Sequence, residues 1–325
     1  MCGAGGFIGG HLVERLKEEG YYVVGVDRKR PEFRESAADG FSLRDLTLPE
    51  EAKDVVNLCA PATSLIEEPG HWDEVYQLAA DMGGMGFISA AELDIMTNSA
   101  RINQNVFEAC AVKPYPPRLF FSSSVCVYPD QHVTDFPRTE IHAYPANPDN
   151  EYGWEKLYAE RLALCYARHT DMEVRIGRFQ NTYGPYGTWC GGREKAPAAL
   201  CRKIAEAEDG GEIEVWGDGR AVRCYTYIDD LIDGIRSVMN SDYGEPVIIG
   251  SDVSISVDDL ALRIAAIAGK RITIKHIDGP VGVAARKFDK ATLKSLGWKS
   301  RCSLDEGLAK TYAWVEEQVD QTIGV

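Results

Sequence analysis

The chain has 325 residues, of which 45% are hydrophobic and 26% are charged, and its formal net charge is −15. This length predicts one large or two ordinary domains, and the composition is that of a soluble globular protein. The negative charge argues against a general binder of nucleic acid or of anionic membranes, because both need a basic surface. No apolar stretch approaches the roughly 20 residues needed to cross a bilayer.

Neither the cysteines nor the histidines form a recognisable motif. The chain begins without a charged-then-apolar leader, which predicts a cytoplasmic protein. Nine cysteines are scattered without a CxxC pair, and such spacing in a cytosolic chain predicts free thiols. Six histidines show no HxxxH or HxxEH pattern, so we expect no metal site.

Helical and strand patterns alternate along the first half of the chain. Residues 9–20 place leucines and valine on one helical face, and the β-branched run 21–27 follows. Residues 116–124 and 173–179 have the pattern of short buried strands, with a helix over 150–169 between them. Repeated strand–helix–strand units predict a Rossmann-type α/β fold, in which a doubly wound parallel sheet is covered on both faces.

The pattern changes after about residue 178, where Gly-rich and Pro-rich segments mix with strands such as 213–219. We therefore expect a cofactor-binding domain over residues 1–177 and a smaller, mixed substrate-binding domain over residues 178–325. Some later segments are expected to return to the first domain.

Two features depart from a regular sheet of this kind. The Gly-rich segment 3–10 should follow a strand, yet only Met1 and Cys2 precede it, so we expect the first, central strand to be truncated. A lost central strand would leave backbone groups of both neighbours unpaired, at about 1–3 kcal/mol for each buried group. Residues 55–60 and 75–80 both resemble the fourth strand of the sheet; only one can fill that position, and the other is expected to be an inserted loop.

A glycine pattern predicts a dinucleotide site at the N-terminus. Gly3, Gly6 and Gly9 form GxxGxxG and open an amphipathic helix, with Phe7 and Ile8 in its first turn. In a strand–helix–strand unit, such glycines allow a tight turn, the approach of a pyrophosphate and close packing of helix and strand. The helix N-terminus then offers N–H groups and a positive dipole to the phosphates.

Acidic residues at the ends of the next two strands predict the choice of cofactor. Asp27 would bind the adenosine ribose and repel a 2′-phosphate, which favours NAD over NADP. The basic run 28–30 favours the opposite choice, because it could serve a 2′-phosphate. Asp45 follows the third strand pattern and is either a partner of the adenine amine or an acid of a surface loop.

A tyrosine and a lysine are spaced for acid–base chemistry. Tyr152 and Lys156 stand at i and i+4, which places both side chains on one helix face. A cationic lysine beside the phenol favours the phenolate, so we expect the pKa of Tyr152 to fall from about 10 and the residue to act as a base. Ser124 lies at the end of a preceding strand, in the order typical of short-chain dehydrogenases.

The combination of Gly3, Gly6, Gly9, Ser124, Tyr152 and Lys156 resembles the extended short-chain dehydrogenase/reductase family of nucleotide-sugar enzymes. Residues 79–87, 123–129, 176–189, 191–203 and 216–219 are similar to the GDP-mannose 3,5-epimerases of that family. The resemblance covers nearly the whole chain from Gly3, and its strings DMGGMG (81–86) and GGREKAPAA (191–199) are long and specific.

The resemblance implies an isomerase that retains NAD. Tyr152 would take the proton of the sugar 4-hydroxyl, leaving a transient 4-ketone that acidifies the hydrogens on C3 and C5. Cys126 and Lys195 would serve as the acid and base that invert these carbons, while Ser124 would hydrogen-bond the 4-oxygen. The implied reaction converts GDP-D-mannose to GDP-L-galactose, a precursor in the plant and algal route to ascorbate. A Val–Cys pair at 125–126, in place of an acidic pair, argues against dehydration.

The resemblance also implies a set of substrate contacts and a homodimer that pairs through helices of the first domain. Glycines would let backbone approach the sugar or nicotinamide, and cations would hold the diphosphate. Ala221 stands where a polar contact to the nucleotide is expected, so nucleotide choice could differ. The alternatives are another nucleotide-sugar 4-epimerase or 4,6-dehydratase, and a non-catalytic NAD-binding protein or inactive truncated homologue. The implied substrate contacts are Gly83, Gly84, Ser124, Asn181, Glu194, Lys195, Lys203, Arg223 and Arg286.

Overall fold

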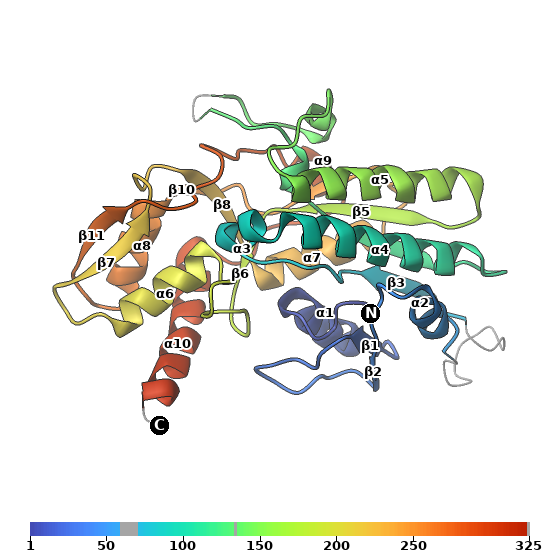
Figure 1. Ribbon diagram of the computed structural model, residues 1–325, viewed down its shortest axis with the longest axis horizontal. Helices are drawn as coiled ribbons and strands as arrows, with labels where there is room; N and C mark the ends of the chain where they lie inside the picture. The colour runs from blue at the N-terminus through green and yellow to red at the C-terminus, as the bar shows by residue number, and fades with distance from the viewer. Residues whose placement is uncertain (59–70, 133–134, 324–325) are drawn as a thin grey trace.

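The computed structural model describes residues 1–58, 71–132 and 135–323, and its centre is a parallel β-sheet (Figure 1). Every ladder between neighbouring strands of this sheet is parallel. In spatial order the strands are β2 (Gly40–Leu43), β1 (Val24–Asp27), β3 (Glu74–Gln77), β4 (Arg118–Ser124), β5 (Val174–Phe179) and β9 (Val247–Ile249), with Cys2 bridging β1 and β3.

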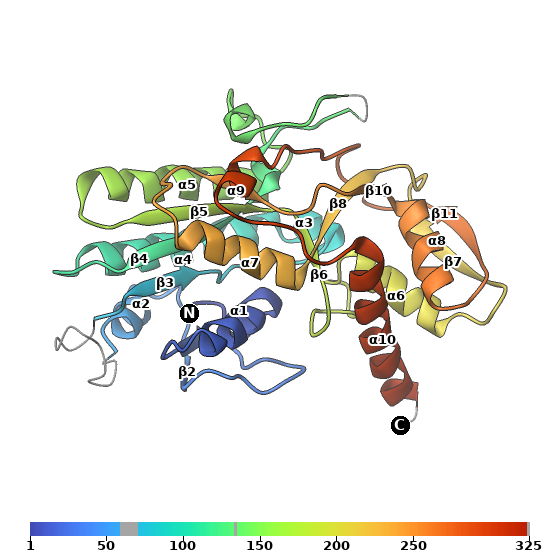
Figure 2. The same ribbon diagram turned by 180° about the vertical axis from the view of Figure 1, so that it is seen from behind.

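Helices cover both faces of the sheet, as predicted for a doubly wound α/β fold. On one face α1 (Phe7–Glu18) packs against α7 (Ile228–Met239), and Figure 2 shows both in front of the strands. On the other face α4 (Glu92–Ala111) lies between α2 (Pro49–Val56) and α5 (Glu151–His169). The predicted helices over 9–20 and 150–169 and the strands over 21–27, 116–124 and 173–179 are confirmed, with shifts at their ends.

Met1 and Cys2 occupy the central position of the sheet. Cys2 donates its backbone N–H to Tyr76 O at 2.9 Å, and Val26 donates to Met1 O at 2.8 Å, so both neighbouring strands pair with this short segment. Beyond it, β1 and β3 flank a hollow whose lining includes Leu16 and Val24. The sheet is therefore continuous at the carboxyl ends of its strands, where the cofactor motif lies.

The fourth strand is β3, which confirms the candidate at residues 75–80. Its residues Glu74–Gln77 pair with Arg118–Phe121 of β4. The other candidate, residues 55–60, is neither strand nor loop at Val55 and Val56, because these two residues end helix α2 and are buried with Ala52 on one helical face. Residues 59 and 60 lie outside the described part of the chain.

The later segments form a second group of elements beside the sheet. Strands β7 (Gly211–Trp216) and β11 (Ile272–Ile277) pair in parallel, while β8 (Val222–Tyr227) pairs with β6 (Asn181–Tyr183) and with β10 (Ser254–Ser256). Strand β9 pairs with β5 of the first sheet, and α7 packs against the same strand. The remaining helices are α3 (Met85–Ala90), α6 (Ala196–Glu206), α8 (Val257–Ile267), α9 (Ala291–Ser295) and α10 (Leu304–Ile323), with 3₁₀ turns at Val125–Val127 and Glu140–Ala143.

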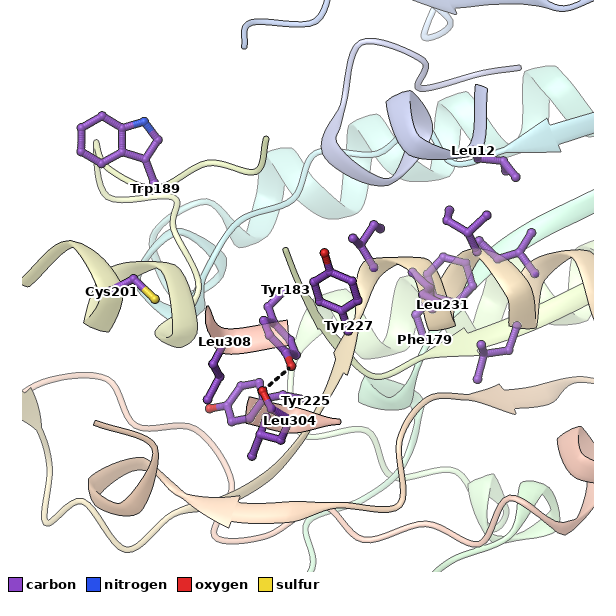
Figure 3. Close-up of a cluster of buried hydrophobic side chains, with 14 of the residues drawn as sticks. Leu12, Phe179, Tyr183, Trp189, Cys201, Tyr225, Tyr227, Leu231, Leu304 and Leu308 are labelled. Carbon is purple, nitrogen blue, oxygen red and sulfur yellow. Dashed lines mark hydrogen bonds between the residues drawn. The ribbon is translucent and has the colours of Figure 1, made fainter. Parts of the chain in front are cut away.

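One hydrophobic core runs through both groups of elements. Figure 3 shows Leu12 of α1 and Leu231 of α7 in the same cluster as Leu308 of α10. At the junction, the Tyr183 hydroxyl donates to Leu304 O at 3.3 Å. This shared core fixes the second group of elements against the carboxyl ends of β4 and β5, which is where the catalytic side chains are expected.

Candidate active site

The catalytic segment begins where strand β4 ends. The Ser124 side chain accepts a hydrogen bond from Cys126 N at 3.1 Å and so caps the 3₁₀ turn that carries the cysteine. Helix α5 starts directly against this turn, since a Cβ added to Gly153 would lie 2.1 Å from Cys126 O. The Asn150 side chain caps the same helix by accepting from Gly153 N at 2.9 Å. Glycine at 153 therefore lets Tyr152 approach Cys126 and Ser124.

Tyr152 and Lys156 lie on the buried face of α5. Burial raises the pKa of Tyr152, the neighbouring Cys126 raises it further, and a hydrogen-bonding interaction with Ser124 opposes this rise. Lys156 Nζ lies 5.8 Å from the centre of the Tyr152 ring and donates to Ser122 O at 3.0 Å. The sequence-based prediction of a lowered tyrosine pKa is wrong for this structure, because burial raises the pKa of Tyr152.

Cys126 and Lys195 are brought within electrostatic range of each other. Lys195 is the N-cap of α6, far from Cys126 in the sequence. Burial lowers the pKa of Lys195, and Cys126 opposes that shift. Burial also lowers the pKa of Arg223. Tyr225 and Cys126 oppose this shift, and Arg286 adds to it. A partly buried thiol, a lysine with a lowered pKa and a buried phenol therefore converge, and all three can exchange protons.

The two glycines of the DMGG loop serve a contact between protein segments. Gly84 N donates to Arg193 O at 2.9 Å, and a Cβ on Gly84 would lie 2.4 Å from Glu194 O. A Cβ on Gly83 would lie 2.8 Å from Phe87. The expected close backbone approach is thus present, but here its partner is the loop that carries Lys195. This contact holds the lysine beside α3.

The glycine motif forms a tightly packed turn before α1. Gly3 has a φ of +83°, and a Cβ there would lie 2.8 Å from Ala79 N. A Cβ on Gly9 would lie 1.9 Å from Gly3 O, so helix and turn touch. At Gly6 the nearest such contact is 3.4 Å, and this N-cap residue has no side-chain cap and no acid in the following turn. Phe7 and Ile8 begin α1 at this open, electropositive end, which fits a pyrophosphate.

Acidic and basic groups around this turn fit NAD better than NADP. Asp27 accepts hydrogen bonds from Gly5 N at 3.0 Å and Lys29 N at 3.2 Å, so its carboxylate is fixed at the end of β1. The basic run 28–30 is already engaged: Arg28 pairs with Asp81, Lys29 with Glu32, and Arg30 lies over the Phe41 ring. Little positive charge is left for a 2′-phosphate. Because adenosine fits the fixed carboxylate, the residues present fit the predicted cofactor.

Asp45 is exposed after strand β2 and binds its own turn. Its carboxylate accepts from Thr47 N at 3.0 Å and from the Thr47 hydroxyl at 2.7 Å. These bonds lower the pKa of Asp45. Of the two roles left open for this residue, the structure favours the acid of a surface turn.

The remaining predicted contacts differ in how free their side chains are. Arg286 is buried and bridges Asp149 at 2.8 Å, and it also donates to Val125 O beside Cys126. Glu194 accepts from Gly192 N at 2.6 Å, so it shapes the loop before Lys195. Arg223 donates to Val281 O at 3.1 Å, and Lys203 to Glu214 O at 2.6 Å. All four side chains therefore make contacts within the protein.

The last two residues singled out in the sequence, Asn181 and Ala221, lie at the starts of strands β6 and β8. Asn181 starts β6, and within the described residues its side chain has no hydrogen-bond partner. Ala221 is buried and directly precedes strand β8. Arg223, two residues further on in β8, interacts electrostatically with Cys126. Sequence reasoning missed Asp81, which binds Arg28 and accepts from Asn98 Nδ2 at 2.8 Å. The signal in the sequence that could have located Asp81 is its position as the first residue of the DMGG string.

Neither a metal cluster nor a membrane-spanning segment is found in the part of the chain that the structure describes. Over residues 1–58, 71–132 and 135–323, no group of three or more His, Cys, Asp or Glu side chains could hold a metal ion. No helix within these ranges is long and apolar enough to cross a membrane.

Comparison with known proteins identifies the family. Residues 1–250 match the NAD dependent epimerase/dehydratase family. The chain belongs to this family. It is 42% identical over 327 residues to GDP-mannose 3,5-epimerase of Arabidopsis thaliana, and the match covers 99% of the chain and 82% of that relative. It is 41% identical to GDP-mannose 3,5-epimerase 1 of Oryza sativa subsp. indica, with the same coverage.

Several solved structures share the fold of this chain. UDP-glucose 4-epimerase of Thermotoga maritima, solved with UDP-glucose, superposes with a TM-score of 0.85 at 24% identity and 98% coverage of both chains. MoeE5, solved with UDP-glucose and NAD, has a TM-score of 0.80 at 27% identity, also with 98% coverage of both chains. The predicted doubly wound fold and the resemblance to GDP-mannose 3,5-epimerases are both confirmed.

Proposed function

We propose that this protein converts GDP-D-mannose to GDP-L-galactose by NAD-dependent epimerisation at C3 and C5 through a transient 4-ketone. The observation that carries this proposal is the convergence of Cys126 and Lys195 beside Tyr152 and Ser124. Curated relatives at 41–42% identity are GDP-mannose 3,5-epimerases, which supports the same substrate. The product places the protein in a route to ascorbate.

The turn before α1 is the proposed NAD site. The N–H groups of Phe7 and Ile8 in the first turn of α1 would bind the pyrophosphate beside the open N-cap Gly6, and the fixed Asp27 carboxylate would accept hydrogen bonds from the adenosine ribose. When bound, NAD supplies the reversible oxidation of the sugar that makes its C3 and C5 hydrogens acidic.

Tyr152 and Ser124 would hold the sugar 4-oxygen. Tyr152 has a buried hydroxyl that can carry the proton of the 4-hydroxyl, and Lys156 beneath it supplies positive charge to that hydroxyl when it is ionised. Ser124 faces the same phenol and would orient the oxygen by a second hydrogen bond. Both groups come from adjoining elements, α5 and the end of β4, so their spacing is set by rigid secondary structure.

Cys126 and Lys195 would carry out the two inversions. Inversion at a carbon requires one group to remove a proton and another to return one, and these two side chains come from different elements, the 3₁₀ turn and the N-terminus of α6. The lowered pKa of Lys195 lets it exchange a proton near neutral pH more readily than an exposed lysine. Thiol and amine together replace the acidic pair that dehydration would need.

The nucleotide part of the substrate would lie along β8 and α6. Arg223 and Lys203 supply cations in a protein of net charge −15, and Arg286 fixes the Cys126 turn from the same side. Asn181, with its free amide, and the Gly83–Gly84 and Glu194 loops would border the sugar. We accordingly take residues 1–177, with the returning segments, as the NAD-binding domain and residues 178–325 as the domain that binds the nucleotide sugar.

A homodimer is proposed through the exposed surfaces of α4 and α5. Leu93 and Met96 lie in the first turns of α4, and Trp154 and Tyr158 lie in the first turns of α5. All four large apolar side chains are exposed, with 79% of Leu93 and 54% of Tyr158 accessible. These neighbouring helices pack together, so their apolar side chains suit a second copy of the same surface. The scattered free cysteines suit the reducing cytoplasm.

Proton exchange with solvent tests the reaction directly. GDP-mannose is incubated with the protein in D₂O and followed by proton NMR, with Cys126→Ser measured in parallel. Because a hydroxyl is far less acidic than a thiol, C126S should reduce deuterium entry at C3 and C5 by about a hundredfold or more. Cys165→Ser, which changes an exposed cysteine on the outer part of α5, is the matched control and should exchange normally. Absence of deuterium with folded, NAD-loaded wild type would refute the proposed reaction.

A further inference from the structure

A pocket beside the glycine turn is built by both groups of elements. Its lining comes from residues 5–7 of the turn before α1, from Lys29 and residues 31–34 of the loop between β1 and β2, and from Tyr186 and Thr188 of the loop after β6. The turn leads into the open N-terminal end of α1, where the pyrophosphate of NAD is proposed to lie. One wall of the proposed cofactor site therefore belongs to the second group of elements.

The loop after β6 rests on the first residue of α1. A Cβ on Gly187 would lie 3.4 Å from the Phe7 ring, and a Cβ on Gly184 would lie 2.6 Å from Ile228 of α7. Among the residues that the structure describes, Tyr186 is the one non-glycine residue with a positive φ, at +63°. A tyrosine in this left-handed region is strained, so the contacts around it must hold it there.

Three side chains surround the Tyr186 ring. The guanidinium carbon of Arg34 lies 4.7 Å from the centre of the ring. The ring centres of Trp314 in α10 and His11 in α1 lie 5.6 and 5.9 Å away. Phe33, next to Arg34, packs edge-on against Trp314 at 5.3 Å. Tyr186 thus lies where α1, α10 and the loop between β1 and β2 meet.

Arg34 is held by α1 as well as by Tyr186. Its Nη1 donates to Glu14 Oε2 at 2.7 Å, and only 14% of the arginine side chain is exposed. A Cβ on Gly10 would lie 2.9 Å from Arg34 Nη2, so the guanidinium lies directly against the helix. Burial lowers the pKa of His11 to about 4, and the charge of Arg34 adds to this shift. Arg34 therefore connects the loop that follows Asp27 to α1 and, through Tyr186, to the second group of elements.

We propose that Arg34 and Tyr186 form a clasp that retains the dinucleotide in this pocket. The inference rests on the proposed NAD site and adds two binding residues to it. The proposed reaction has no net redox change, so the cofactor has to stay bound through each turnover, and joining the two walls of the pocket serves that need. Arg34 also brings a fixed positive charge to the lining, which suits an anionic diphosphate in a protein of net charge −15.

Release of NADH tests the clasp without any sugar substrate. The protein is loaded with NADH and mixed with a large excess of NAD⁺ in a stopped-flow instrument, and the loss of bound NADH fluorescence gives the dissociation rate. Arg34→Met removes the charge and keeps most of the side-chain stem, while Tyr186→Ala removes the ring. Each variant should raise the dissociation rate about tenfold, because lost contacts at a binding site act mainly on the off-rate.

The double variant Arg34→Met/Tyr186→Ala distinguishes a clasp from two independent contacts. If the two side chains act as one unit, loss of either opens the edge of the pocket. The double variant should then release NADH no more than about twofold faster than the faster single variant. Glu14→Gln weakens the other anchor of Arg34 and leaves both clasp residues in place, so it should raise the rate by a smaller factor, about threefold.

The matched control is Arg263→Met. It breaks an ion pair of similar length, 2.9 Å between Arg263 Nε on α8 and Asp305 on α10, at a position outside the pocket lining. R263M should release NADH at the rate of the wild type. Equal acceleration in R263M would show that any loosened contact of α10 has the effect, and it would overturn the inference.

Unchanged NADH release from folded R34M and Y186A would also overturn the inference, as would a double variant whose increase is the product of the two single increases. If these variants do not fold, Glu14→Gln decides, and release at the wild-type rate counts against the clasp. Wild type that holds NADH in this way without epimerising GDP-mannose would refute the proposed reaction and leave the clasp standing. Wild type that binds no NADH would refute both the proposed NAD site and the clasp.

Discussion

The ion pair between Arg178 and Glu160 should be the most costly buried contact to break near the active site. Arg178 Nε and Nη2 donate to the two Glu160 oxygens at 2.8 and 2.7 Å, and the side chains are only 3% and 2% exposed. Nη1 donates to the Tyr128 hydroxyl at 2.8 Å and to Glu140 O at 2.7 Å. Glu160 also accepts from Ser123, next to Ser124. The pair thus joins α5 and β5 behind the catalytic strand.

Arg178→Met leaves the Glu160 carboxylate buried with only the Ser123 hydroxyl as a donor. Removing one partner of a buried pair costs about 3–5 kcal/mol, because the other charge stays desolvated without compensation. We expect a loss of that size in the free energy of unfolding. The double variant Arg178→Met/Glu160→Leu removes both charges, and it should recover most of the loss because well-packed apolar groups of similar volume often replace a buried pair without cost.

Urea denaturation followed by tryptophan fluorescence gives the free energies of unfolding from the midpoints and slopes. All variants are compared at one protein concentration and without nucleotide, since ligands and oligomers change apparent stability. A coupling energy of about 2–3 kcal/mol between the two sites is expected from the double-mutant cycle. A single R178M variant that loses less than about 1 kcal/mol, or a double variant as unstable as the sum of the singles, would refute the reasoning.

Two further predictions concern a buried lysine and the proposed dimer surface. Burial lowers the pKa of Lys290 to about 8 from an ordinary 10.5, so the unfolded chain binds this proton more tightly and wild-type stability rises with pH between about 8 and 10.5. Lys290→Met should therefore raise the free energy of unfolding at pH 7 by up to about 3 kcal/mol and raise it little near pH 10.5, measured by urea titration. The control Lys294→Met, at an exposed position, should leave the free energy of unfolding nearly unchanged, and an equal gain from Lys290→Met at both pH values would contradict the charge argument. Tyr158→Lys places a charge in the proposed interface and should weaken dimerisation by about a hundredfold in light scattering, whereas Tyr243→Lys, on the loop between α7 and β9, should not; dimers unchanged by Y158K would argue for a different surface.

Most of the fold could be predicted because its signals are local. The helix over 150–169 follows from its periodicity and from the Asn150 cap, and the buried strands 116–124 and 173–179 follow from continuous apolar runs. The fourth strand could not be chosen from the sequence. Residues 55–56 and 75–77 have similar apolar runs, and only pairing with β4, a contact between distant segments, makes Glu74–Gln77 the strand.

In the candidate active site, too, local sequence patterns were predictive and properties that depend on the folded chain were not. GxxGxxG, YxxxK and the DMGG and GGREK strings located Gly3, Tyr152, Lys156 and Lys195, because each requires fixed residue types at fixed spacing. The ionisation of these groups could not be predicted. Burial, which only the folded chain produces, raises the pKa of Tyr152 against the expected direction.

By itself, the sequence determined which residue types are available for the chemistry, where the helices and strands begin, and to which family the chain belongs. The tertiary structure decided which of these residues meet. It placed Lys195 within electrostatic range of Cys126, turned Arg28 towards Asp81, and used Gly84 for a contact with the loop that carries Lys195. The physical reason is that spacing along a helix or strand fixes local geometry, whereas burial and long-range pairing depend on how the whole chain packs.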